Sequence, residues 1–114
     1  MIQVEVSRNR KGEVTAIRAQ GHADYAAYGS DIICAAATAV ITTAMAGLED
    51  LIQVKHERIL LEGDVGLKLD NSQSLDPTQT EQRNLILNTC VLGLKQIEFS
   101  YGNEYIKVLD TGGN

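Results

Sequence analysis

The stretch Asp31-Ile-Ile-Cys-Ala-Ala-Ala-Thr-Ala-Val-Ile-Thr-Thr-Ala-Met-Ala-Gly-Leu48 decides how this chain folds. Its apolar residues recur at helical spacing, and its six alanines favour a helix. Ser30 or Asp31 can cap the first turn, because either side chain accepts a hydrogen bond from an unpaired backbone N–H. We therefore expect a helix over residues 31–48.

Strands are expected on both sides of this helix. Residues 2–6 alternate between apolar and polar side chains, and residues 14–20 resume an extended pattern after a polar turn. Beyond the helix, residues 58–61 and 65–69 flank the turn Glu62-Gly63-Asp64, in which glycine can adopt a positive φ. The segments predict two hairpins.

A second helix has a well-defined start. Asp76 is an N-cap residue, Pro77 stands at the first helical position, and Gln79 completes a capping box. An apolar row then continues until Gly102 ends the helix, and residues 105–109 form a last strand. The resulting order, β-β-α-β-β-α-β, predicts an α+β fold with two helices packed on a mostly antiparallel sheet.

Length and composition indicate one globular domain over residues 1–114, of which residues 111–114 form a frayed tail. Hydrophobic residues make up 44% and charged residues 22% of the chain, which argues against disorder. Fifteen acidic against ten basic residues give a net charge of -5, so nucleic acid is not an expected partner.

The chain shows no pattern typical of export or membrane insertion. Its first residues alternate in polarity, unlike a signal peptide, and the longest apolar stretch, residues 32–40, is too short to cross a bilayer. Two cysteines cannot form the dense disulfide framework of a small secreted protein. We expect a cytoplasmic protein with free thiols.

The segment between residues 21 and 34 holds the reactive side chains. His22 follows the expected end of a strand, and Cys34 lies in the first turn of the helix, roughly at its third position. The N-terminus of a helix stabilises a thiolate, and a nearby imidazole can take the thiol proton. The pair meets the minimum for nucleophilic catalysis, whereas packing of Cys34 in the core is the competing interpretation.

Other residues of this segment have either supporting or ordinary roles. Asp31 can cap the helix, orient the imidazole or bind substrate. Gly21 and Gly29 bracket the loop, where they permit positive φ or hinge motion, or simply form turns. Tyr25 and Tyr28 are candidates to line a pocket for a large side chain.

Cys90 and His56 lie outside this segment. Cys90 belongs to the apolar row of the second helix, which predicts a core position, and His56 stands between two charged residues on an expected solvated edge. No CxxC or HxxxH pair supports a metal site, and no glycine-rich phosphate loop is present. We expect neither a metal nor a cofactor.

The small residues between positions 35 and 47 allow a close approach of the first helix to the sheet or to another helix. Core packing explains most of them. A domain of this size cannot bury both sides of an apolar helix, so a homodimer interface is the alternative.

The stretch from Gly21-His22, through Gly29, to Asp31-Ile-Ile-Cys34-Ala-Ala resembles the signature of the bacterial ribosomal-processing cysteine proteases, the Prp family. The resemblance extends along nearly the whole chain. It implies that Cys34 is the nucleophile, that His22 is the general base, and that Asp31 supports them. It also implies a small dimeric enzyme that removes an N-terminal extension from the precursor of a large-subunit ribosomal protein.

Two other readings of the sequence remain open. In one, the chain binds or chaperones a ribosomal protein without cutting it, and the histidine and cysteine contribute only shape. In the other, the chain is a structural dimer whose cysteine packs in the core and resists alkylation until the protein unfolds.

Overall fold

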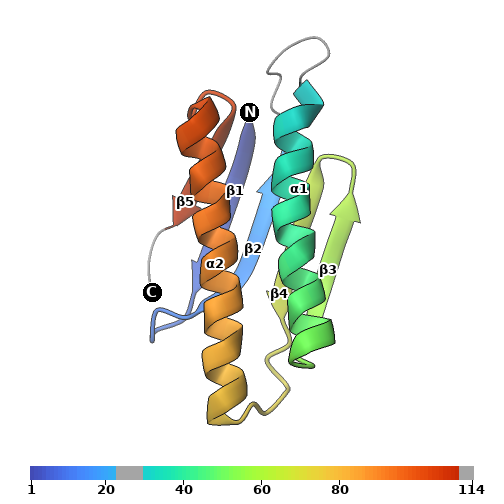
Figure 1. The fold of residues 1–114 in the computed structure, drawn as a ribbon, viewed down its shortest axis with the longest axis vertical. Helices are drawn as coiled ribbons and strands as arrows, with labels where there is room; N and C mark the ends of the chain where they lie inside the picture. The colour runs from blue at the N-terminus through green and yellow to red at the C-terminus, as the bar shows by residue number, and fades with distance from the viewer. Residues whose placement is uncertain (23–29, 111–114) are drawn as a thin grey trace.

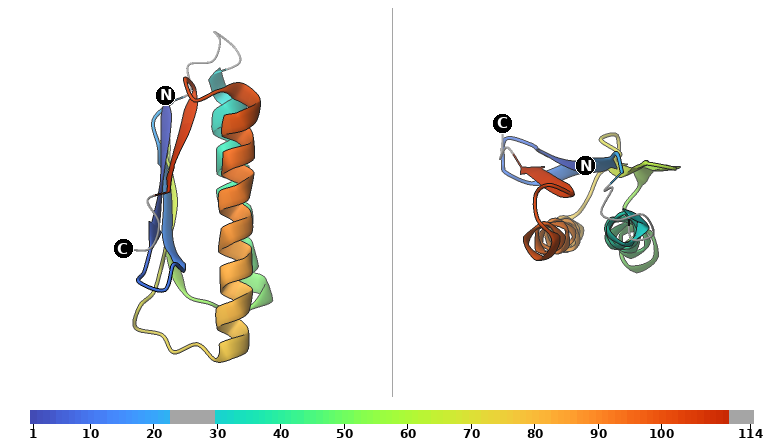
Figure 2. Two further views of the ribbon diagram at one scale, coloured as in Figure 1. Left: turned by 90° about the vertical axis from the view of Figure 1, so that its left-hand side faces the viewer. Right: turned by 90° about the horizontal axis from the view of Figure 1, so that it is seen from above.

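The computed structural model describes residues 1–22 and 30–110, and it has a five-stranded sheet with two helices on one face (Figures 1 and 2). The elements are β1 (Ile2–Arg8), β2 (Val14–Gln20), α1 (Ser30–Ala46), a π-helical turn η1 (Gly47–Leu51), β3 (His56–Leu61), β4 (Asp64–Leu69), α2 (Pro77–Tyr101) and β5 (Ile106–Asp110). The predicted α+β class and element order are confirmed. The expected tail at residues 111–114 lies outside the described residues.

The strands are arranged in the order β3-β4-β2-β1-β5. Each neighbouring pair is antiparallel except β1 and β5, which are parallel. The exception arises because α2 carries the chain back along the sheet before β5 begins (Figure 1). Val4 pairs with Ala19 on one side and with Val108 on the other, so β1 lies inside the sheet.

The sheet buries one face under the helices and leaves the other face to solvent (Figure 2). In β1 the side chains of Ile2, Val4 and Val6 are buried, whereas Gln3 and Glu5 are exposed. The alternation in the sequence therefore correctly predicts which side chains face the core.

Small residues bring the two helices together. An added Cβ on Gly93 of α2 would lie 3.1 Å from Cγ1 of Val40 in α1, so a larger residue there would push the helices apart. Cys90, one helical turn earlier, is buried, and its Sγ lies 3.8 Å from the backbone oxygen of Val40. The expected close approach and the expected core position of Cys90 are both found.

The apolar region of α1 is longer than the expected residues 32–40. Because the helix continues through η1, Ile32–Leu51 spans 20 residues with a mean hydropathy of 1.7, which by length and composition is enough to cross a membrane. About a third of this window is buried inside the protein, and Ile33, Ile41 and Leu48 contribute to the core. These three side chains pack one side of α1 and η1 against the core.

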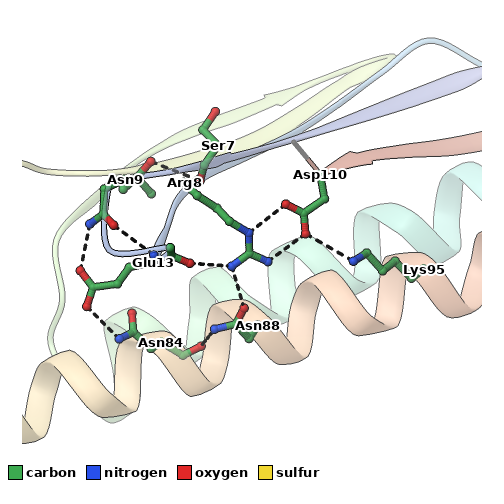
Figure 3. Close-up of polar contacts among 10 residues, drawn as sticks. Ser7, Arg8, Asn9, Glu13, Asn84, Asn88, Lys95 and Asp110 are labelled. Atoms are coloured by element: carbon green, nitrogen blue, oxygen red, sulfur yellow. Dashed lines mark hydrogen bonds and ion pairs between the residues drawn. The ribbon is translucent and has the colours of Figure 1, made fainter. Parts of the chain in front are cut away.

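A polar cluster joins the far end of β1 to α2 and β5 (Figure 3). Arg8 donates two hydrogen bonds to the carboxylate of Asp110, of 2.8 and 2.9 Å, and Lys95 approaches the same carboxylate at 3.3 Å. Glu13 accepts hydrogen bonds from Asn9 and Asn84 and pairs with Arg83 at 3.0 Å. We call this group the Arg8 cluster; it consists of Arg8, Asn9, Glu13, Arg83, Asn84, Asn88, Lys95 and Asp110.

Candidate active site

His22 and Cys34 line one pocket of about 350 Å³. The first follows the end of β2, and the second lies on the N-terminal part of α1. The turn between β3 and β4 forms another wall, to which Leu60, Leu61 and Gly63 contribute. Ile2 of β1 also lines the pocket, which thus collects residues from four segments that are far apart in the sequence.

The position of His22 depends on the glycine before it. Gly21 has a φ of +107°, and an added Cβ there would collide with the backbone oxygen of Met1. Its N–H donates a hydrogen bond of 2.9 Å to the backbone oxygen of Gly63. Only glycine fits this conformation and this close contact, so Gly21 turns the chain sharply as it leaves β2.

Cys34 is the fifth residue of α1, because the helix begins at Ser30, earlier than expected. The expected third position is therefore wrong by two residues. The thiol is half-buried and packs beside the core while it lines the pocket. Within residues 1–22 and 32–110, the side chains of Cys34 and His22 make no hydrogen bond to another group.

The two cysteines have different environments. Cys90 is only 4% exposed, and its burial raises the pKa of the thiol to about 12. Its thiol therefore remains protonated at neutral pH and is screened from reagents. Cys34 is the thiol that the pocket presents.

An ion pair joins β2 to the start of β4 beside the pocket. Arg18 of β2 donates hydrogen bonds of 2.9 and 2.7 Å to the carboxylate of Asp64, the first residue of β4. The hydrogen bond from Arg18 lowers the pKa of Asp64, and a weaker contact from Gln20 acts in the same direction. Asp64 therefore remains a carboxylate at neutral pH that is already bound to Arg18.

Several expected site residues belong to the segment that the structure does not describe. Tyr25, Tyr28 and Gly29 lie outside the described residues. Asp31 is the second residue of α1, and its side chain also lies outside the described part of the structure. Their expected roles therefore remain predictions.

His56 has a structural setting on the edge strand β3, as its expected edge position implies. One ring nitrogen lies 3.2 Å from the backbone oxygen of Val54, and the other accepts a hydrogen bond of 3.0 Å from Arg58. Among the described residues, no group of three or more histidine, cysteine, aspartate and glutamate side chains could hold a metal ion.

The sequence does not predict the contribution of the β3–β4 turn to the pocket. The Glu-Gly-Asp motif predicts a turn, and the positive φ of Gly63, +71°, is confirmed. The missing information is the pairing of β4 with β2, with Gln20 opposite Asp64, which brings the turn beside His22. An alternation pattern does not show which strands become neighbours.

Comparison with known proteins points to one group of enzymes. A family model described as Cysteine protease Prp matches residues 1–107. The ribosomal processing cysteine protease Prp of Staphylococcus aureus (strain Mu50) is 35% identical over 108 residues, which cover 95% of this chain and 97% of that protein. The protein of the same name from Bacillus subtilis is 28% identical over 109 residues, covering 89% of this chain and 90% of that protein.

Solved structures give the same result. Crystal structures of an essential ribosomal processing protease Prp from S. aureus, one with a covalently linked product peptide and one with a substrate peptide, superpose with TM-scores of 0.80 and 0.79. Each is 29% identical, and each comparison covers 97% of this chain and 100% of the other.

Proposed function

Because the chain belongs to the Prp family of ribosomal-processing cysteine proteases, we propose that it removes the N-terminal extension of a large-subunit ribosomal protein, with Cys34 as the nucleophile and His22 as the general base. The observation that carries the assignment is the shared pocket: among the described residues, it brings one histidine and one accessible thiol together. The supporting role of Asp31 is part of the proposal.

The reaction follows from these two side chains. His22 takes the proton of the Cys34 thiol, and the sulfur attacks the carbonyl carbon of the scissile peptide bond. Backbone N–H groups in the first turn of α1, which lack helical partners, stabilise the negative oxygen. As the C–N bond breaks, the imidazolium returns its proton to the leaving amine. Water, deprotonated by His22, then attacks the thioester and releases the new C-terminus and the free thiol.

The surroundings of the pocket suit an extended apolar peptide. Leu60 and Leu61 are 54% and 66% exposed beside the pocket, and they offer apolar surface to hydrophobic or aromatic substrate side chains. Tyr25 and Tyr28 are proposed to add to this surface when substrate binds, and Gly21 and Gly29 to act as hinges of the loop between them. The net charge of -5 favours encounter with a basic ribosomal protein. Because ribosomal proteins are made in the cytoplasm, we place the reaction there.

Incubation of the folded chain with the precursor ribosomal protein of its host, followed by mass spectrometry, tests the proposal. Wild-type protein should produce cleavage at one bond, and Cys34→Ala should produce none. Binding of the precursor without a new N-terminus would instead identify a non-catalytic binding module. Cleavage by Cys34→Ala at the wild-type rate would refute the nucleophile.

We also propose that the active form is a homodimer. A groove of about 840 Å³ runs between α1 and α2, and apolar and small residues line most of it, including Ala39, Leu51 and Leu85. On α2, Leu85, Leu92 and Phe99 are 71%, 61% and 91% exposed at intervals of seven residues, which places them along one side of the helix. So much exposed apolar surface on a small domain indicates a protein interface.

Light scattering coupled to size-exclusion chromatography tests the dimer. Leu85→Glu adds a charge to the groove and should convert the dimer to a monomer. Gln3→Glu adds the same charge to the open face of the sheet, and it should leave the dimer intact. A monomeric wild-type protein at micromolar concentration would refute the proposal.

A further inference from the structure

The turn between β3 and β4 lies directly against His22. β4 pairs with β2 in a register that puts Asp64 opposite Gln20, the residue that ends β2. The backbone oxygen of Gly63 accepts the 2.9 Å hydrogen bond from Gly21, so the turn is also joined to the residue that precedes the histidine. This hydrogen bond continues the antiparallel pairing of β2 with β4 by one residue pair, and it fixes the turn beside the imidazole.

Gly63 leaves no space for a side chain next to that ring. A Cβ on Gly63 would lie 3.0 Å from Nε2 and 3.2 Å from Cε1 of His22. Both distances are shorter than the optimal separation of nonbonded carbon atoms, which is about 3.5 to 4.0 Å. Either the turn or the imidazole would therefore have to move if Gly63 carried a side chain.

The imidazole is the part that would move. The ion pair between Arg18 and Asp64 has two hydrogen bonds and joins the strand after the turn to β2. His22, in contrast, is exposed, and within the described residues its ring forms no hydrogen bond that would hold it. A small displacement of the ring costs less than a displacement of the paired strands.

We propose that Gly63 is a positioning residue for the protease reaction, because its missing side chain lets the imidazole of His22 rest against the turn within the pocket that Cys34 lines. This inference rests on the proposed function, since it takes His22 to be the base. A general base must lie within hydrogen-bond reach of the proton that it takes, so a shift of several tenths of an ångström in Nε2 slows the step.

A second glycine allows the effect of the contact with His22 to be distinguished from the effect of backbone strain in the turn. Gly12, in the turn between β1 and β2, has a φ of +81°, close to the +71° of Gly63. Alanine at either position adopts a left-handed backbone and incurs a similar strain. A Cβ on Gly12 meets nothing within 4 Å, however, so only Gly63→Ala adds a contact with the histidine.

The experiment compares Gly63→Ala with Gly12→Ala in three measurements. These are the cleavage rate of the ribosomal precursor, the pH profile of Cys34 alkylation, and the NMR shifts of the His22 ring protons. We expect Gly63→Ala to displace the ring resonances, change the alkylation profile and lower kcat/KM about tenfold at neutral pH. Gly12→Ala should leave all three within about twofold of the wild type while its Tm falls by a similar amount.

Gly63→Asn provides a second variant, because asparagine tolerates the left-handed backbone and carries the same Cβ. It should reproduce the loss of kcat/KM with a smaller fall in Tm. Equal behaviour of the Gly63 and Gly12 variants would overturn the positioning role.

A His22→Ala control distinguishes the role of His22 as the base from the positioning role of Gly63. If His22→Ala loses cleavage while Gly63→Ala keeps it, only the positioning role is overturned. If His22→Ala retains full cleavage, the proposed base is wrong, and the positioning role falls with it.

Discussion

The polar side chains near the two ends of β1 differ in how far they are hydrogen-bonded. At its start, Ile2 lines the pocket in which His22 and Cys34 have no hydrogen-bond partner among the described residues. At its end, Arg8 and Asp110 are only 15% and 12% exposed, and each binds more than one group (Figure 3). The difference shows how one small domain divides its polar residues between chemistry and stability.

Polar groups that satisfy one another lose the freedom to react. The carboxylate of Asp110 is engaged by Arg8 and Lys95, and the hydrogen bonding that Arg8 donates to Asp110 is the main cause that raises the pKa of Arg8. Such a cluster ties β1, β5 and α2 together. The pocket lacks these constraints, so its thiol and imidazole remain available to a substrate.

Replacement of each cysteine by alanine should give the largest difference in cleavage rate between two variants. Cys34→Ala should lower the cleavage rate by at least about 10³-fold and leave the free energy of unfolding nearly unchanged. Cys90→Ala should keep the cleavage rate within about twofold and cost about 1 kcal/mol, because it removes a buried atom. Cleavage assays and urea denaturation of both variants measure the contrast, and loss of cleavage in folded Cys90→Ala would break it.

In the Arg8 cluster, we expect a substitution to lower the free energy of unfolding and to leave the cleavage rate unchanged. Arg8→Ala removes two hydrogen bonds from the carboxylate of Asp110, whose side chain is only 12% exposed, and we expect a loss of about 2 kcal/mol in the free energy of unfolding. Arg10→Ala, on the exposed turn, should cost less than about 0.5 kcal/mol. The folded Arg8→Ala protein should cleave at the wild-type rate; a large fall in kcat would connect the cluster to the chemistry.

The pH dependence of stability gives the smallest effect. Hydrogen bonds from Asn9 and Asn84, with the charge of Arg83, lower the pKa of Glu13 below its ordinary 4.5. The carboxylate therefore stabilises the folded state above that value, and this contribution disappears as the pH falls through the lower, folded pKa.

Urea titrations between pH 6 and pH 3 measure this contribution. Glu13→Gln should be less stable than the wild type at pH 6 by less than about 1 kcal/mol, and the difference should shrink toward pH 3. Glu104→Gln replaces an exposed carboxylate outside the cluster and should leave the acid slope unchanged. A constant difference across the range would show that the charge of Glu13 has no part in stability.

Local patterns predict most of this fold. The alternation of Ile2, Val4 and Val6 selects the buried face of β1, and the capping box of α2 forms as expected, with a 2.8 Å hydrogen bond from the N–H of Gln79 to Asp76. These features depend on residues close together in the sequence, for which side-chain chemistry is decisive.

The site is only partly predictable, because its parts meet through strand pairing. The sequence identifies His22 and Cys34 by residue type and by their places at the end of a strand and the start of a helix. It does not reveal that Gly63 reaches the imidazole, since that contact follows from the pairing of β4 with β2. The same holds for the Arg8 cluster, in which Arg8 and Asp110 are 102 residues apart.

The rate of Cys34 alkylation by iodoacetamide, measured against pH for the wild type and His22→Ala, shows whether the imidazole activates the thiol. If the open pocket couples the imidazole to the thiol, the variant should react several-fold more slowly near neutral pH, and its profile should move to higher pH. Cys90 should stay unmodified in both folded proteins, because burial holds its pKa at about 12. Superimposable profiles would show that the two side chains share a pocket without acting as a catalytic pair, and His22 would not be the base.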